Sequence, residues 1–315
     1  MIKRALILFT IITIVLYGFR KVHYYGLLKQ NKGYYQTYKT AFLEKNEFNV
    51  LFLGSSRVQM HYNTFLFDSI NQTNAFNLSM AGATPKVAYY ALKIYLSKSK
   101  TPTIVIYDVD YHNLNNESKE IKDFNNYFPF LKDEVVRNEF CKIDKRFKWF
   151  YYLPYYSLPY TGTKNLSTGL HGLFNIPNRT DSLFYKGYFK ENTRKPLDVT
   201  FTKASNIKID PIEYAYLDSL CQIGRAKNIE MVFCSSPIFA GGKLDVANKT
   251  ELLNTILKLV QSYNYTYTDL SSLSFCDQRD LFVDHFHMNY QGARLFTLKM
   301  SELYRNNLVK KALKP

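Results

Sequence analysis

The fold follows from the stretch LFLGSSRV at residues 51–58, where a short apolar run ends in a turn of small hydroxyl residues. Such runs, bounded by Gly and Ser, are typical of strands buried in a parallel sheet. This alternation of runs predicts an α/β fold, a three-layer α/β/α sandwich with a central, mostly parallel sheet and with ligands at the carboxyl ends of its strands. Strands are predicted at 50–53, 75–78, 103–107, 230–234 and 265–269, and amphipathic helices at 85–97, 211–226, 249–263 and 290–308.

The composition narrows the class of protein. Of the 315 residues, 46% are hydrophobic and 21% are charged, a balance that allows one large globular domain or two small ones. An aromatic content of 17% excludes a disordered chain and a collagen-like or coiled-coil protein. The net charge of +15 predicts a surface that attracts anionic lipid, glycan or nucleic acid. Because Lys and Arg are spread along the chain rather than clustered, we expect no nucleic-acid partner.

An uncharged apolar run extends from Ala5 to Phe19, behind a short basic amino terminus. At ~1.5 Å per residue it makes roughly 22 Å of helix, which is short for a ~30 Å hydrocarbon core. It is followed by Arg20 and Lys21, not by the small residues of a cleavage site. We therefore predict an uncleaved signal anchor at residues 1–25, a single-pass helix in the inner (cytoplasmic) membrane. A buried amino-terminal helix is the alternative.

Behind the anchor we expect a membrane-proximal linker helix at 26–48 and then one domain at 49–315, outside the cytoplasm. This domain contains an insertion at about 112–206, where prolines interrupt the rhythm of strands and helices. Its densest aromatic stretch, FKWFYYLPYYSLPY at 147–160, suits stacking on sugar rings, lying on a membrane surface, or ordinary packing. The four cysteines lie far apart without zinc-ligand spacing, which leaves one or two disulfides open.

Two polar stretches carry the chemistry. In the first, Ser56 lies in a tight turn after a strand, where it can act at the sheet edge or cap the next helix. In the second, FVDHFHMN at 282–289, Asp284 precedes His287 by three residues, so the carboxylate can orient the imidazole toward a neighbouring hydroxyl. Asp284, His285 and His287 are also metal-ligand types, but without a fourth ligand nearby in sequence we expect no metal.

Together the Gly-x-Ser turn and the Asp-x-x-His motif resemble the SGNH/GDSL hydrolase superfamily, and NLSMAG at 77–82 looks like its second block. The resemblance implies a flavodoxin-like SGNH fold without a cofactor. It implies that Ser56 is the nucleophile, that His287 is the general base and acid, and that Asp284 fixes the histidine tautomer. The backbone amides of Ser56 and Gly82 would then form the oxyanion hole.

Two departures from the family pattern matter. Ser55 stands where the first block commonly has Asp, so either serine could be taken for the nucleophile, and alignment on the third residue favours Ser56. The third block, usually Gly-x-Asn-Asp, here reads YDVDYH and lacks its Asn. Ionised Asp108 or Asp110 aimed at an oxyanion would oppose catalysis, so the donor comes from elsewhere or the activity is low. Arg57 can bind an acidic substrate group or form a salt bridge to one of these carboxylates.

The anchor and these departures make the chain similar to a membrane-anchored SGNH-like branch. That branch includes the D-alanine transfer protein of teichoic-acid modification and the alginate acetylation proteins. The resemblance implies a serine acyltransferase or esterase that helps O-acylate, for instance O-acetylate, a cell-envelope polysaccharide together with a membrane-bound O-acyltransferase. One alternative is a catalytically silent accessory protein that binds the glycan or the acyltransferase. Another is an esterase without a membrane partner.

Overall fold

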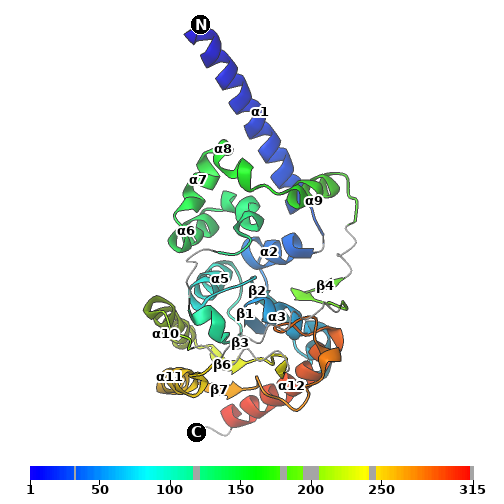
Figure 1. Ribbon diagram of the computed structural model, residues 1–315, viewed down its shortest axis with the longest axis vertical. Coiled ribbons are helices and arrows are strands. Elements are labelled where there is room, and N and C mark those ends of the chain that lie inside the picture. The colour runs from blue at the N-terminus through cyan, green and yellow to red at the C-terminus, as the bar shows by residue number, and fades with distance from the viewer. Residues whose placement is uncertain (32, 116–120, 178–182, 194–205, 241–245, 313–315) are drawn as a thin grey trace. The chain divides into compact units, whose positions relative to one another are not determined.

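The computed structural model describes residues 1–31, 33–115, 121–177, 183–193, 206–240 and 246–312 (Figure 1). The chain forms two compact units, and the insertion predicted at 112–206 contributes to both. The helical unit comprises Met1–Lys45, Lys93–Lys98 and Glu120–Ser182, and the sheet unit comprises Asn46–Leu92, Ser99–Lys119 and Leu183–Pro315.

The sheet unit is built on five parallel strands in the order β2-β1-β3-β6-β7. This order, in which the first strand in sequence lies inside the sheet, is that of flavodoxin-like folds. All five predicted strands are confirmed, with ends within one or two residues of the prediction. They are β1 (Val50–Gly54), β2 (Ala75–Ser79), β3 (Ile104–Asp108), β6 (Glu230–Ser235) and β7 (Thr266–Asp269).

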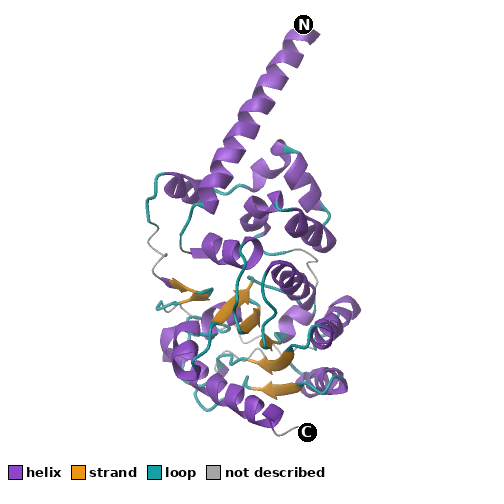
Figure 2. Cartoon of the chain, turned by 180° about the vertical axis from the view of Figure 1, so that it is seen from behind, coloured by secondary structure: helices purple, strands orange, loops and turns teal. Residues whose placement is uncertain are grey.

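Helices cover both faces of this sheet, so the predicted three-layer α/β/α fold is confirmed (Figures 1 and 2). Side chains alternate along each strand: Phe52 and Ile106 join a buried cluster with α3, α4 and α12, while Met231 lies against Gly224 of α10 on the other face. The four predicted helices are present, and the last is longer than predicted. The helices are α3 (Ser56–His61), α4 (Thr64–Asn71), α5 (Pro85–Lys98), α10 (Pro211–Ala226), α11 (Lys249–Ser262) and α12 (Tyr290–Ala312).

A small hairpin, β4 (Phe184–Tyr185) and β5 (Tyr188–Phe189), lies at the edge strand β2. The carbonyl of Lys186 accepts a hydrogen bond from the N–H of Asn77, at 2.9 Å. Gly187 has φ +84°, and a Cβ there would lie 2.0 Å from the Asn77 carbonyl oxygen. Glycine is therefore required at this close approach, which covers an edge that would otherwise offer unpaired backbone groups.

The helical unit has a core of aromatic rings. Tyr38 and Phe42 of α2 pack against Tyr127, Phe130 and other rings of the insertion. Phe147 and Phe150 are buried against Phe140 and Phe128, so part of the aromatic stretch at 147–160 provides ordinary packing, one of the three roles considered for it. The elements of this unit are α1 (Ile2–Leu28), α2 (Gly33–Leu43), η2 (Phe124–Lys132), α6 (Glu134–Ile143), α7 (Arg146–Tyr152), α8 (Pro154–Ser157), η3 (Leu158–Tyr160) and α9 (Thr163–Leu173).

Helix α1 is 27 residues long and apolar enough to cross a membrane. The mean hydropathy of its most apolar window is 1.9, and none of that window is buried. An amino-terminal helix buried in the protein, the alternative to an anchor, would have its apolar side chains covered. The described structure instead leaves most of them exposed between Ile2 and Phe19, and none of them is buried.

Candidate active site

The turn between β1 and α3 places Ser56 at the carboxyl edge of the sheet. Gly54 has φ +151°, and a Cβ there would lie 2.6 Å from Val58 Cγ2 and 3.1 Å from the Asp108 carbonyl oxygen. Only glycine fits both this backbone conformation and this space. The next residue, Ser55, is the N-cap of α3, and its hydroxyl accepts a hydrogen bond from the Arg57 N–H at 3.3 Å. Ser55 thus caps the helix, and Ser56 becomes its first residue.

The structure brings the three residues of the predicted triad together. Ser56 Oγ lies 2.9 Å from His287 Nε2, although 231 positions separate the two residues. His287 Nδ1 lies 2.8 Å and 3.1 Å from the two carboxylate oxygens of Asp284. Because the Asp284 carboxylate accepts a hydrogen bond from Nδ1–H, the proton of the neutral ring is on Nδ1, and Nε2 can accept the proton of the Ser56 hydroxyl.

Asp284 is held in its ionised form. Its carboxylate also accepts hydrogen bonds from the backbone N–H groups of Phe286, at 3.0 Å, and His287, at 2.9 Å. Partial burial raises the pKa of Asp284, but the hydrogen bond from the His287 side chain, its charge and the two backbone amides outweigh burial and lower this pKa to about 2. A carboxylate that is ionised at neutral pH can stabilise an imidazolium at His287.

Replacement of Asp284 by Asn tests this ionisation through stability. The folded-state pKa, about 2, lies below the ordinary value of 3.8, so the carboxylate stabilises the fold above about pH 4 and this contribution is lost as pH falls toward 2. The shift corresponds to at most about 2 kcal/mol. Hydrogen exchange of wild type and Asp284→Asn at several pH values should show a stability difference that shrinks between pH 4 and 2. A constant difference would contradict the assignment.

A buried histidine that was not predicted holds the backbone beside His287. His61, in the last turn of α3, accepts a hydrogen bond at Nε2 from the Met288 N–H, at 3.0 Å, and its Nδ1 lies 3.1 Å from Ser236 Oγ. Burial, and then the positive charges of Arg57 and His287, hold the pKa of His61 well below its usual value. The neutral ring therefore donates a hydrogen bond from Nδ1 to the Ser236 hydroxyl oxygen. Because Ser56 and His61 both belong to α3, this short helix positions Ser56 and also the loop that carries His287.

Substitution of His61 tests whether its hydrogen bond positions the loop that carries His287 or whether the ring only fills space in the core. His61→Leu removes the acceptor of the Met288 N–H, and a displacement of the order of 1 Å at His287 should lower kcat by about 10²-fold with little change in KM. His61→Gln keeps a hydrogen-bond acceptor and should recover most of the loss. Ester hydrolysis kinetics of the two variants provide the test. Equal losses in both would mean that His61 only fills space.

Arg57 lies in the interior, where it forms salt bridges. Arg57 is 2% exposed, and its guanidinium donates hydrogen bonds to the carbonyl and hydroxyl oxygens of Ser236. The guanidinium also lies 3.7 Å from the Asp108 carboxylate and 3.4 Å from the Asp110 carboxylate. Of the two interpretations left open by the sequence, the described contacts fit the salt bridge. A guanidinium buried in this way compensates part of the negative charge of the third block from within the protein.

Both carboxylates of that block have further partners. Asp108, which is 2% exposed, accepts from the Tyr62 hydroxyl and the Ser236 N–H, each at 3.1 Å. Burial raises the pKa of Asp108, and Arg57 opposes this rise. Asp110 accepts from the Ser55 hydroxyl at 3.3 Å and caps the short η1 helix (Tyr111–Leu114). Neither carboxylate is left as an unpaired charge beside Ser56.

The predicted oxyanion donors lie in adjacent turns. The Met80 N–H donates to the Gly54 carbonyl at 3.1 Å, so the turn after β2 lies against the turn after β1. Gly82 has φ +61°, a conformation that favours glycine. Within the part of the chain that the structure describes, neither the Ser56 N–H nor the Gly82 N–H donates to another residue. Both amides are therefore available to a ligand.

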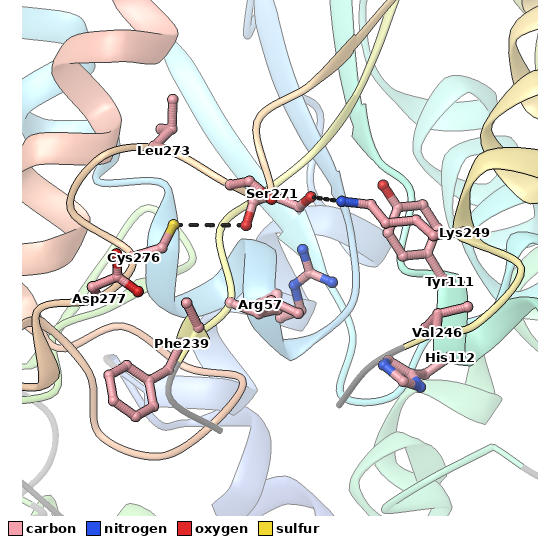
Figure 3. Close-up of a pocket in the computed structure, with 13 residues that line it drawn as sticks. Arg57, Tyr111, His112, Phe239, Val246, Lys249, Ser271, Leu273, Cys276 and Asp277 are labelled. Atoms are coloured by element: carbon pink, nitrogen blue, oxygen red, sulfur yellow. Dashed lines mark hydrogen bonds between the residues drawn. The ribbon is translucent and has the colours of Figure 1, made fainter. Parts of the chain in front are cut away.

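A pocket of about 380 Å³ opens beside Arg57 at the carboxyl ends of β6 and β7 (Figure 3). Lys249 donates to the Ser271 hydroxyl at 2.7 Å and forms a salt bridge with Asp269 at 3.2 Å. The Cys276 thiol donates to the Ser271 carbonyl at 3.6 Å. Arg57 directly follows Ser56 in the chain, whereas Ser56, Asp284 and His287 are not among the described residues that line the pocket. The described lining residues are Arg57, Tyr111, His112, Ile238, Phe239, Ala240, Val246, Lys249, Ser271, Ser272, Leu273, Cys276 and Asp277.

The four cysteines are free thiols, so the disulfides that the sequence left open do not form in this structure. In the described ranges, no group of three His, Cys, Asp or Glu side chains is placed to hold a metal ion. Asp284 and His287, two of the three candidate ligands, are bound to each other instead.

Comparisons with known proteins give the chain no established activity. Residues 27–153 match a family described as "Protein of unknown function (DUF1574)", a match over less than half of the chain. No curated protein matches the sequence. Among solved structures, the chain is similar to an acetyl xylan esterase, AlAXEase, with 13% identity and a TM-score of 0.40 over 81% of this chain and 98% of that one. At this TM-score the likeness adds nothing to the fold and the triad of this chain.

Proposed function

We propose that this chain is a membrane-anchored SGNH-like serine acyltransferase or esterase, with its sheet unit outside the cytoplasm. In this role it helps O-acylate, for instance O-acetylate, a cell-envelope polysaccharide together with a membrane-bound O-acyltransferase. The observation that carries the catalytic part is the continuous hydrogen-bonded chain from Ser56 Oγ through His287 to Asp284. The anchor, the +15 charge and the family resemblance support the setting.

The proposed reaction has two steps. Ser56 Oγ attacks the acyl carbonyl carbon while its proton moves to His287 Nε2, and Asp284 stabilises the imidazolium. The tetrahedral intermediate collapses, and the leaving alcohol takes the proton from His287. A hydroxyl of the acceptor then attacks the acyl-serine and gives its proton to His287. As the bond between the acyl carbon and Ser56 Oγ breaks, His287 returns this proton to Oγ, and the acylated acceptor leaves. Water in place of the acceptor makes the same site an esterase.

The altered third block fits a site in which hydrolysis is slow. An oxyanion hole without the side-chain amide of that block relies on the amides of Ser56 and Gly82. Loss of one donor typically lowers the rate by ~10²–10³-fold. Arg57 offsets part of the negative charge of Asp108 and Asp110 and so reduces their opposition to the developing oxyanion. The same donors stabilise the tetrahedral intermediates of acylation and of transfer, so both steps are expected to be slow without the partner acyltransferase.

The pocket beside Arg57 is the proposed place for part of the substrate. Its volume of about 380 Å³ lies at the lower end of the ~300–1,000 Å³ range of small-molecule sites. Rings of Tyr111, His112 and Phe239 and the polar groups of Lys249 and Ser271 line it, a mixture that suits a sugar ring. Phe239 is tied to the loop of the triad, because its N–H donates to the His285 carbonyl at 3.0 Å.

Three strains test the proposal: wild type, a deletion of the gene, and Ser56→Ala at the native locus. The readout is the O-acyl content of the envelope polysaccharide. We expect the deletion and Ser56→Ala to lose acylation to the same extent. A Ser56→Ala strain that acylates like wild type while the deletion does not would identify the chain as the silent accessory protein. Deletion without effect on acylation would point to an esterase that has no acyltransferase partner.

A further inference from the structure

We propose that the helical unit lies on the membrane, with a surface of α7, α8 and α9 in contact with lipid at the depth where α1 leaves the bilayer. This inference rests on α1 crossing a membrane but not on any chemistry at Ser56. The surface, called here the interfacial surface, consists of exposed residues on α7 and α8 and exposed residues in or directly after α9. They are Trp149, Tyr152, Leu153, Tyr156, Leu170, Phe174 and Ile176.

The exposure of these side chains needs an explanation. Trp149 is 48% exposed and Phe174 is 71% exposed, while Phe147 and Phe150 on the same helix as Trp149 are buried. Helix α7 therefore has aromatic side chains on two faces, one packed in the core and the other exposed. Exposed large apolar side chains that cluster on neighbouring helices beside a membrane-spanning segment indicate contact with another molecule or with a membrane.

Helix α1 fixes the depth of this surface because it is tightly joined to α9. His23 Nε2 lies 2.9 Å from the Asn165 carbonyl oxygen, and Gln30 donates to the Thr168 carbonyl at 2.8 Å. Between these bonds the two backbones touch: a Cβ on Gly172 would lie 1.9 Å from the Gly26 carbonyl oxygen. Such an approach requires glycine and leaves no room for α1 to slide along α9.

Arg20 sets the depth of α7. It is the first residue after the apolar run of α1, and its guanidinium donates to the Phe150 carbonyl oxygen at 3.1 Å. Trp149 is the neighbour of Phe150 in sequence, and Leu153 lies one turn further along. A charged group at the end of a membrane helix resides at the lipid–water interface. The backbone that carries Trp149 is held at that interface by a hydrogen bond.

Lipid fits this surface better than glycan does, because the exposed apolar run of α1 ends at Phe19 and the next residue, Arg20, contacts α7. The amphipathic rings of Trp and Tyr are the residue types that membrane interfaces favour. Exposed Lys145, Lys148 and Lys164 lie on or beside α7 and α9, where they suit anionic headgroups. Contact along the surface also compensates for the short apolar run of α1.

Trp149 makes the test direct, because it is the only tryptophan of the chain. The full-length protein is reconstituted into vesicles of phosphatidylcholine and phosphatidylglycerol, with or without lipids brominated near the headgroup end or deep in the acyl chains. We expect blue-shifted emission, strong quenching by the shallow bromines, weaker quenching by the deep ones, and protection from aqueous iodide. Emission that iodide quenches and brominated lipid does not would overturn the proposal.

Two variants sharpen the test. Leu153→Glu places a charge in the interfacial surface and should shift Trp149 emission to the red and reduce lipid quenching. Val135→Glu places the same charge on an exposed position of α6 outside the surface and should change neither. Carbonate extraction of both variants verifies that α1 remains inserted. If the protein resists carbonate extraction but Trp149 is exposed to water, α1 spans the membrane and the proposed lipid contact of the interfacial surface is contradicted. Protection of Trp149 by soluble polysaccharide instead of lipid would also overturn the proposal.

Discussion

Ser56→Ala is expected to lower ester turnover by about 10⁶-fold, the loss typical when the nucleophile of a serine triad is removed. The fold should remain, because the hydrogen bond of Ser56 Oγ is made to the partly exposed His287, and Ala suits the first turn of a helix. Release of p-nitrophenol from p-nitrophenyl acetate by the purified full chain measures the loss. Unchanged hydrogen exchange in β1 and α3 shows that the fold is intact.

Ser55→Ala is the matched control, since the two serines are neighbours with different roles. Ser55 caps α3 and donates to Asp110, so its loss should cost about 1 kcal/mol of local stability and leave turnover within about tenfold of wild type. The reverse result, full loss in Ser55→Ala and activity in Ser56→Ala, would exchange the assignment of the two residues.

Arg57→Met is expected to destabilise the sheet unit by about 3–5 kcal/mol, because it leaves two carboxylates without their buried cation. Asp108 would bear most of this cost, since it is almost fully buried and lies 3.7 Å from the guanidinium. Hydrogen exchange in β1 and β3 measures the opening free energy of this unit by itself, apart from the helical unit. A loss below about 1 kcal/mol would show that the charges are compensated in another way.

The double variant Arg57→Met/Asp108→Asn identifies the cause. If the unpaired carboxylate dominates the cost, removing its charge should recover a large part of the stability lost in Arg57→Met. Asp108→Asn alone should be less destabilising than Arg57→Met, because Arg57 keeps Asp110 and Ser236 as partners. Equal stability of Arg57→Met and the double variant would mean that lost packing of the long side chain is responsible.

The strands could be predicted from local patterns in the sequence, whereas the roles of Ser56, His287 and Asp284 were predicted from the Asp-x-x-His spacing together with the family resemblance. The buried apolar run at 50–53 is followed by Gly54 and two serines, which are typical turn residues, so the end of the strand can be predicted from neighbouring residues alone. Asp284 and His287 are three residues apart, and the hydrogen bond between them is set by a single turn. Only the meeting of His287 with Ser56 is long-range, and the α/β topology brings both to one edge of the sheet.

The support of the site could not be predicted in this way. His61 contacts Met288 across 227 positions, and an isolated histidine in the sequence gives no sign of such a partner. The sequence offered a salt bridge of Arg57 as one of two interpretations, and the choice between them depends on the burial of Arg57, which no local pattern reveals. In the aromatic stretch, Phe147 is buried and Trp149 exposed because of the helices packed around them. Whether such a side chain is buried or exposed depends on tertiary contacts, which the composition of the stretch does not determine.

Labelling of the purified full chain with a fluorophosphonate probe tests the central claim most directly, because the probe reacts only with an activated serine. The account predicts labelling of wild type at Ser56, located by mass spectrometry of the modified peptide, and its loss in Ser56→Ala and His287→Ala. Absence of labelling in folded wild type, or labelling that persists in His287→Ala, would contradict a working triad.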